Sequence, residues 1–201
     1  MKTRNLEDDK KRLESIIDKS WEIVKDKRAF GALRFNKEPE FQLQFSIIIE
    51  KVGQLYCARK TDDFEIVPQY HIEGEKQDRR KYIDITCRLN EATAAIELKC
   101  KRDSAAWVRA GIYYDLMKLE SYNHDIKAFY FATTSKAYLK NDTIAGEEFK
   151  THDGFNIKPG HYGTPELSAK IDESEVDLTQ TYRFNWQRIG EWLFLCMKPK
   201  K

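Results

Sequence analysis

The sequence lacks the features that mark several large classes of protein. It has no run of about 18 apolar residues, the length that a membrane-spanning helix needs. Its first eleven residues are too polar for a secretory signal peptide. We therefore expect a cytoplasmic protein with no membrane partner.

Cysteine is also scarce. The four cysteines are widely spaced and form no Cys-x-x-Cys pair, which argues against a zinc ribbon or an iron–sulfur cluster. These residues are Cys57, Cys87, Cys100 and Cys196. We expect them to be buried free thiols.

The chain has no large excess of charge of either sign. Its 35 lysines and arginines nearly balance its 33 aspartates and glutamates, which gives a net charge of +2. Nucleic-acid-binding domains often have a pI above about 9, so any basic surface here must be local. The hydrophobic content of 41% and aromatic content of 12% are too high for a disordered chain. The length of 201 residues suits one folded domain with a core of its own, with or without appended helices.

Two amphipathic helices are predicted near the N-terminus. Residues 5–27 carry apolar side chains at helical spacing, and residues 38–56 repeat the pattern with Pro39 in the first turn. The apolar positions of the first helix are Leu13, Ile16, Ile17, Trp21 and Val24, and those of the second are Phe41, Phe45, Ile48, Val52 and Leu55. The first helix either forms the interface of a homodimer or packs on its own domain.

After residue 64 the pattern changes to short β-rich runs. We predict strands at 65–70, 82–89 and 93–100, a helix at 104–122 capped by Asp103 or Ser104, and a buried strand at 126–133. Residues 140–175 read as a long irregular segment, and residues 178–197 as a closing hairpin with core-facing aromatic side chains. This order predicts an α/β or α+β fold in which helices cover a small central sheet.

The strands 82–89 and 93–100 carry the residues that suggest chemistry. If the turn centres on Asn90 and Glu91, Asp84 lies opposite Glu97, with Cβ atoms about 4.5–5.5 Å apart. Lys99 shares the face of Glu97, since strand side chains alternate. Two carboxylates this close need a shared proton or a cation, and hard oxygen ligands suit Mg²⁺. A neighbouring lysine can orient a nucleophilic water or stabilise developing negative charge.

This set predicts a phosphodiester hydrolysis site, although the triplet Asp/Glu-x-Lys alone is uninformative. It occurs five times in this charge-rich chain, and only Glu97 to Lys99 lies in an apolar strand paired with a strand that carries an aspartate on the matching face. The alternative is an ordinary ladder of charged side chains on the solvent face of a hairpin.

The Asp84 strand, the Glu97-Leu98-Lys99 strand, and the helix and strand that follow resemble the PD-(D/E)xK nuclease superfamily. The resemblance covers residues 38–134 and implies a restriction endonuclease-like fold, with a central mixed sheet flanked by helices. It also implies that Asp84, Glu97 and the backbone carbonyl of Leu98 bind Mg²⁺, with Mn²⁺ as a substitute. Lys99 then serves the attacking water.

In that superfamily an acidic residue on the helix before the sheet often completes the metal site. Glu40 is the candidate here, and Glu50 is its competitor. Ile83 stands where the family name has proline, a mild departure because that proline is not a ligand. No Gln-x-x-x-Tyr follows Lys99, which disfavours the exonuclease branch that carries this motif.

The resemblance implies a Mg²⁺-dependent endonuclease that hydrolyses DNA in restriction, defence or repair, with RNA as the other substrate left open. The alternatives are a nuclease-fold protein that binds nucleic acid or a protein partner without cleaving, and a plain interaction module. Two basic clusters flank the site, and they either contact phosphates or form a solvated charged rim. They comprise Arg79, Arg80 and Lys81, and Lys101, Arg102 and Arg109. The implied organisation is a helical extension at 1–36 and a nuclease-like domain at 37–201, which includes an irregular insertion at about 140–177 and a C-terminal β-hairpin.

Other polar residues receive simpler interpretations. Asp115 and Lys118 are spaced for a surface ion pair on the helix 104–122, and a role near the active site is the alternative. The histidines show no spacing typical of a metal cluster or a catalytic triad, so surface or loop positions are expected for His71, His124, His152 and His161. Of these, His152 and His161 belong to the irregular segment, from which they could reach a substrate.

Overall fold

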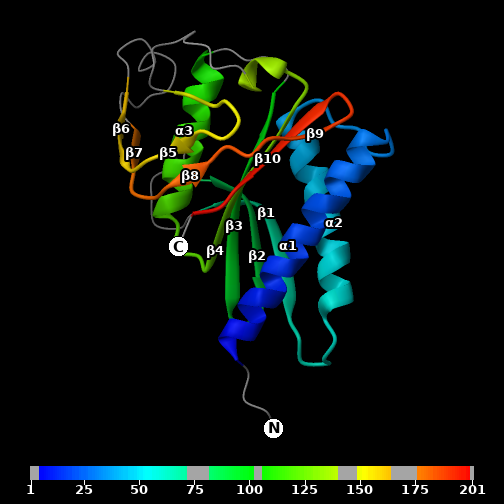
Figure 1. The fold of residues 1–201 in the computed structure, drawn as a ribbon. Helices are drawn as coiled ribbons and strands as arrows, with labels where there is room; N and C mark the ends of the chain where they lie inside the picture. The colour runs from blue at the N-terminus through cyan, green and yellow to red at the C-terminus, as the bar shows by residue number, and fades with distance from the viewer. Residues whose placement is uncertain (1–4, 72–81, 102–105, 140–148, 164–175, 200–201) are drawn as a thin grey trace. The chain divides into compact units, whose positions relative to one another are not determined.

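The computed structural model describes residues 5–71, 82–101, 106–139, 149–163 and 176–199. They form a mixed α/β structure, as the sequence predicts (Figure 1). Its elements are α1 (Leu6–Ala29), α2 (Glu38–Tyr56), β1 (Phe64–His71), β2 (Tyr82–Leu89), β3 (Ala92–Cys100), α3 (Ala106–Ser121), β4 (Ile126–Thr133), the 3₁₀ helix η2 (Lys136–Leu139), β5 (Asn156–Ile157), β6 (Gly160–Tyr162), β7 (Val176–Leu178), β8 (Tyr182–Arg183), β9 (Gln187–Ile189) and β10 (Trp192–Met197).

One sheet has the strand order β1-β2-β3-β4-β10-β9, and two small sheets pair β5 with β8 and β6 with β7. The chain divides into two compact units. The first unit comprises Met1–Leu98 with Asn123–Lys127, and the second comprises Lys99–Tyr122 with Ala128–Lys201. The sequence-based division at residue 36 stays a prediction.

In the first unit α1 and α2 lie side by side (Figure 1). Asn5 caps α1, because its side chain accepts a hydrogen bond from the Glu7 N–H at 3.1 Å. All five apolar positions predicted for this helix are buried. The Trp21 ring lies 6.1 Å from that of Phe41 and 5.8 Å from that of Phe45 on α2. Of the two alternatives for the first helix, the structure shows packing on its own unit.

The buried face of α2 agrees with the prediction except at its end. The predicted positions from Phe41 to Val52 are buried, but Leu55 is 83% exposed and that part of the prediction is wrong. The inward position is taken by Tyr56, whose hydroxyl lies 3.1 Å from Ser15 Oγ and whose carbonyl accepts a hydrogen bond from Arg12 at 2.6 Å. The buried stripe of α2 therefore ends at Tyr56, four residues after Val52, and not at Leu55, three residues after it.

The strands β1, β2 and β3 form an antiparallel meander. The predicted turn at Asn90 and Glu91 is present. Asn90 has a φ of 56°, a left-handed conformation that asparagine tolerates better than most residues. Its side-chain amide donates to Asp9 Oδ2 at 3.0 Å, and its side-chain oxygen accepts from the Asp63 N–H at 3.0 Å. The turn is thus attached both to α1 and to the start of β1.

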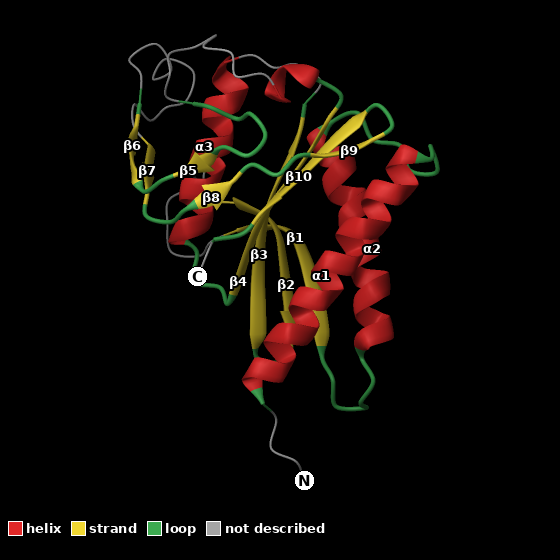
Figure 2. Cartoon of the chain, viewed as in Figure 1, coloured by secondary structure: helices red, strands yellow, loops and turns green. Residues whose placement is uncertain are grey.

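In the second unit β4 and β9 both pair antiparallel with β10, which lies between them (Figure 2). The predicted closing hairpin is confirmed for residues 187–197, with Gly190 at a φ of 61° in its turn, but it is wrong for the earlier residues, because β7 pairs with β6 and β8 with β5. The aromatic side chains predicted to face the core are buried except Trp186, which is half-buried. The alternation itself is wrong in β10, because Leu193 and Leu195 are buried as well. Side chains on both faces of β10 are therefore buried, and such a strand reads as a nearly continuous apolar run.

The predicted irregular segment at 140–175 is described only at 149–163. There it contains β5 and β6, which pair with the later strands β8 and β7. The interpretation as wholly irregular is therefore wrong for these residues. Strands of two and three residues are too short to show an alternating pattern.

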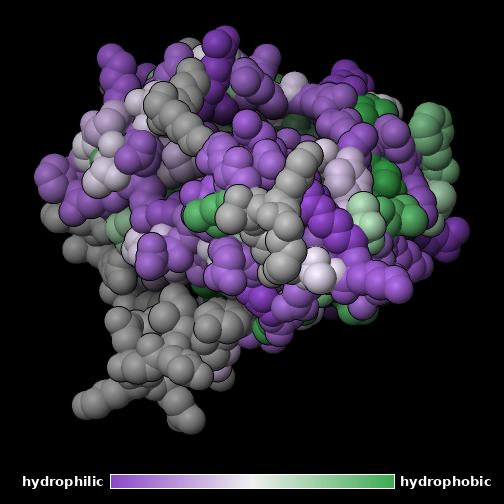
Figure 3. Space-filling model, turned by 90° about the horizontal axis from the view of Figure 1, so that it is seen from below, coloured by the Kyte–Doolittle hydropathy of each residue, from purple (hydrophilic) through white to green (hydrophobic). Residues whose placement is uncertain are grey.

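The four cysteines are thiols, as predicted, but only Cys87 and Cys100 are buried. Burial raises the pKa of the Cys87 thiol, which makes it unreactive. On the face drawn in Figure 3 most side chains are hydrophilic, and hydrophobic ones appear in small groups. Among the described residues no helix combines the length and the apolar character that crossing a bilayer requires.

Candidate functional site

The hairpin of β2 and β3 places Asp84 and Glu97 at opposing positions. Ile85 pairs with Ile96, so the next residue away from the turn on each strand is Asp84 on β2 and Glu97 on β3. Directly opposed residues of an antiparallel pair have Cβ atoms about 4.5–5.5 Å apart and point to the same face. Glu97 is only 2% exposed, whereas Asp84 is half-buried. The paired positions end at Ile85 and Ile96, and the same register continued by one residue sets Asp84 opposite Glu97, as the turn position predicts.

Contacts from two elements hold Asp84. Its Oδ2 accepts a hydrogen bond from the Leu98 N–H of β3 at 2.7 Å. Its backbone carbonyl accepts one from Gln42 Nε2 of α2. The Asp84 carboxylate is thus fixed against the neighbouring strand, and the start of α2 is joined to the same point of β2.

Lys99 follows Glu97 by two residues along β3, so their side chains leave the same side of that strand. The Lys99 ammonium pairs with the carboxylate of Asp115 on α3, and both side chains are 12% exposed. Gly111 lies one helical turn before Asp115, and a Cβ at that position would be 3.5 Å from Lys99 Cε. The Lys99 side chain therefore lies along α3 and ends at Asp115.

The predicted surface pair of Asp115 with Lys118 is wrong, because Asp115 is buried and pairs with a strand residue. The burial of Asp115 was not predicted, although the sequence carries a signal for it. The signal was its position seven residues after the buried Val108, which puts it on the apolar face of α3, where an unpaired carboxylate would be costly.

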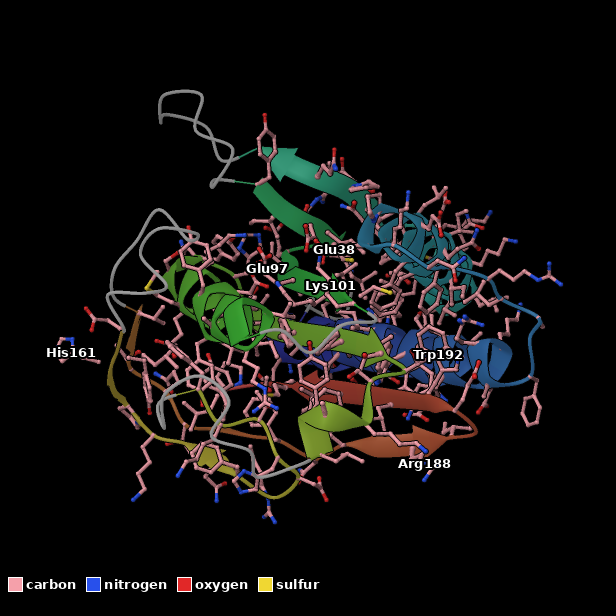
Figure 4. All side chains as sticks on the ribbon, turned by 90° about the horizontal axis from the view of Figure 1, so that it is seen from above. Glu38, Glu97, Lys101, His161, Arg188 and Trp192 are labelled. Atoms are coloured by element: carbon pink, nitrogen blue, oxygen red, sulfur yellow. The ribbon has the colours of Figure 1, made fainter. Side chains whose placement is uncertain are left out.

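The structure places neither of the two α2 carboxylates proposed from the resemblance in contact with Asp84 among the interactions it describes. Glu40 is exposed and accepts a hydrogen bond from the Asn36 N–H at 2.7 Å, which serves the start of the helix. Glu50 is exposed near the middle of α2. The α2 side chain that contacts Asp84 is Gln42, a neutral amide that sequence reasoning missed. Figure 4 marks Glu97 on β3 and Glu38 at the start of α2.

Within the described ranges, no cluster of three or more histidine, cysteine, aspartate and glutamate residues could hold a metal ion. The donor types at the hairpin nevertheless fit Mg²⁺ or Mn²⁺. Mg²⁺ usually keeps several waters and is bound through one or two carboxylates, and Asp84 and Glu97 supply two hard oxygen donors on one face. The residues that would hold such an ion are these two carboxylates and the carbonyl of Leu98.

The basic residues proposed to contact phosphates are described only in part. Arg79, Arg80, Lys81 and Arg102 lie outside the described residues. Lys101 is half-buried just after β3. Arg109 is 4% exposed, donates to the Ala137 carbonyl at 2.9 Å and lies over the Tyr138 ring at 5.9 Å from its centroid. A guanidinium used in this way holds η2 to α3, so Arg109 is not retained as a phosphate contact.

The structure describes the side chains of three of the four histidines. His124 is half-buried, and burial lowers its pKa. His152 is half-buried and lies against the Phe155 ring, 5.1 Å between centroids. His161 is exposed and pairs with Asp177, joining β6 to β7 (Figure 4). The side chain of His71 lies outside the described residues.

A pocket of about 240 Å³ opens in the first unit beside Thr86 and Arg88, which lie on the same face of β2 as Asp84. Arg88 already pairs with Asp63 at 2.8 Å and with Glu65 at 3.0 Å. Thr93, across the pocket, is hydrogen-bonded to Asp125. Arg88, Glu65 and Thr93 are therefore engaged within the fold. Its residues are Glu65, Val67, Thr86, Cys87, Arg88, Thr93 and His124.

Comparisons of the chain with models of protein families, with curated protein sequences and with solved structures find no match. A function must therefore be inferred from the side chains of the β2–β3 hairpin and from the residues that hold them.

Proposed function

We propose that the protein is a metal-dependent nuclease that hydrolyses phosphodiester bonds in DNA. The observation that carries this proposal is the opposition of Asp84 and Glu97 on neighbouring strands, with Lys99 two residues further along β3. The proposal includes a restriction endonuclease-like fold. The order of a helix, three antiparallel strands, a helix and a further strand supports it.

In this proposal each side chain has a distinct task. Asp84, Glu97 and the Leu98 carbonyl hold Mg²⁺, which when bound makes water more acidic and offsets phosphate charge. The Lys99 ammonium lies beside the attacked phosphate and stabilises the negative charge that develops on its oxygens. A water oxygen forms the new bond to phosphorus while one P–O ester bond breaks. The water gives up a proton to solvent, and the departing alcohol takes one up from solvent.

The direct test is cleavage of supercoiled plasmid and of linear single-stranded DNA with Mg²⁺, with Mn²⁺ and with EDTA. We expect cleavage that EDTA abolishes. The variants Asp84→Asn, Glu97→Gln and Lys99→Ala should each lower the rate by about 100-fold or more, the usual contribution of such groups. Glu91→Gln is the matched control, because it removes an exposed carboxylate from the turn of the same hairpin.

Two measurements separate a lost site from a lost fold. Far-UV circular dichroism should be unchanged in Glu97→Gln and Lys99→Ala, and calorimetric titration with Mn²⁺ should show binding that Asp84→Ala removes. Cleavage that continues in EDTA, or that survives in all three site variants, would falsify the proposed mechanism. An RNA strand of the same sequence tests the other substrate.

A specific observation favours a second function, that of a protein which binds nucleic acid without cleaving it. The α2 side chain that contacts Asp84 is the neutral Gln42, where the superfamily often places an acid. Fluorescence anisotropy with labelled DNA in EDTA, at two salt concentrations, measures binding apart from cleavage. Salt-dependent binding without cleavage in either metal would favour this second function over the first.

A further inference from the structure

The Lys99–Asp115 pair is more enclosed than an ordinary surface ion pair. Each side chain is 12% exposed, and the carboxylate belongs to the buried face of α3. Exposed lysines move among many rotamers and gain little from a nearby carboxylate. Poorly solvated charges interact more strongly, and removing one partner leaves the other buried and unpaired. Asp115 therefore restricts where the Lys99 ammonium can lie.

The surface of α3 reinforces this restriction. A Cβ at Gly111 would be 3.5 Å from Lys99 Cε and 3.6 Å from Lys99 Nζ. Position 111 has no side chain, so the aliphatic part of Lys99 can pass close to the α3 backbone there. An alanine fits there in ordinary van der Waals contact, whereas a longer side chain would occupy the path of the lysine. Gly111 and Asp115, one helical turn apart, thus restrict the conformation of the Lys99 side chain along α3.

We propose that Asp115 is a positioning residue that holds the Lys99 ammonium in one place, so that Lys99 acts on the substrate from a fixed position along α3. This inference rests on the proposed function, in which Lys99 serves the hydrolysis.

The pair itself can be observed without any assay of activity. In protein labelled with ¹⁵N-lysine, an enclosed and paired ammonium exchanges its protons slowly and should give a resolved NMR signal, assigned by its loss in Lys99→Ala. We expect Asp115→Asn to abolish or shift that signal. Asp177→Asn is the matched control, because it removes the carboxylate of an exposed pair in the same unit and should leave the signal unchanged.

Kinetics then tests the role of the pair. Asp115→Asn should lower kcat about 10- to 100-fold and leave KM within about threefold, because the interaction acts after substrate has bound. Asp115→Glu should recover part of the loss. The double variant Lys99→Ala/Asp115→Asn should be no slower than Lys99→Ala alone, since Asp115 acts through Lys99.

A second pair of variants keeps the test sharp if Asp115→Asn folds poorly. Gly111→Ala should retain the NMR signal and the kcat, and Gly111→Leu should lose both while Asp115 stays intact. A wild type that cleaves, with an unchanged kcat in Asp115→Asn and Gly111→Leu, overturns the positioning role alone. A wild type that does not cleave overturns the proposed function, so the two failures are distinguishable.

Discussion

Alanine substitution at two helical glycines is expected to change the free energy of unfolding in opposite directions. Alanine is about 1 kcal/mol more favourable than glycine in a helix interior. In α3, a Cβ at Gly111 meets Lys99 at 3.5 Å, an ordinary contact, so Gly111→Ala should stabilise the protein by about 0.5–1 kcal/mol. In α2, a Cβ at Gly53 would lie 2.2–2.5 Å from ring atoms of Phe64, a severe overlap.

Overpacking of this kind costs about 1–3 kcal/mol, which exceeds the helical gain. We therefore expect Gly53→Ala to lower the free energy of unfolding by up to about 2 kcal/mol. Urea denaturation followed by tryptophan fluorescence gives this value from the midpoint, provided that the slope of the transition is unchanged. In the background Phe64→Ala the ring is absent, so the same substitution at Gly53 should become stabilising.

The outcome that refutes this reasoning is specific. If Gly53→Ala stabilises the protein as much as Gly111→Ala does, the Phe64 ring moves aside without cost and does not constrain α2. If Gly53→Ala is equally destabilising with and without the ring, the loss has another origin than the overlap between α2 and β1.

Two further results are expected in the first unit. Arg12 Nη2 lies 2.7 Å from Asp62 Oδ2 and is the main reason that the pKa of Asp62 falls to about 2. Because this folded value lies below the unfolded value near 3.9, the pair contributes about 1 kcal/mol at neutral pH, and that contribution is lost as the pH falls through about 4 to 2. The unfolding free energies of wild type and Asp62→Asn should therefore converge in acid, and a constant difference down to about pH 2 would contradict this. Asn90→Ala should lower the free energy of unfolding by about 2 kcal/mol, since it removes the hydrogen bonds to Asp9 and Asp63 and places alanine at a positive φ. Asn90→Gly should recover the part of this loss that comes from the positive φ, because glycine adopts that conformation without strain. Equal urea midpoints for the two variants would show that the backbone conformation contributes nothing.

Local patterns in the sequence are sufficient to predict the helices and the hairpin. The burial of Leu13, Ile16 and Val24 follows from helical periodicity alone, and the position of Asn90 in the turn sets which residues of β2 and β3 oppose each other. The opposition of Asp84 and Glu97 depends on nothing beyond that turn. For this reason the central pair of the candidate site can be located from the order of the residues alone.

Features that depend on distant residues cannot be predicted in the same way. Asp115 has a nearby lysine in sequence, but its partner is Lys99, because strand β3 brings a second cation to the same helix face. Leu55 is exposed and Tyr56 is not, since α1 supplies the partners that receive Tyr56. Periodicity identifies a face of a helix, and tertiary contacts decide which residue ends it.

The position of β10 between β4 and β9 has a consequence for synthesis of the chain. Thr133 pairs with Leu193, sixty positions later, so β4 leaves the ribosome well before the strand that covers its edge. Phe129 and Phe131 of β4 are fully buried in the finished sheet. Until β10 is made, the edge of β4 that pairs with it is open. An uncovered apolar edge readily associates with other chains. Yield during expression should therefore depend on how quickly the last strand is made or on a chaperone that shields β4 in the meantime.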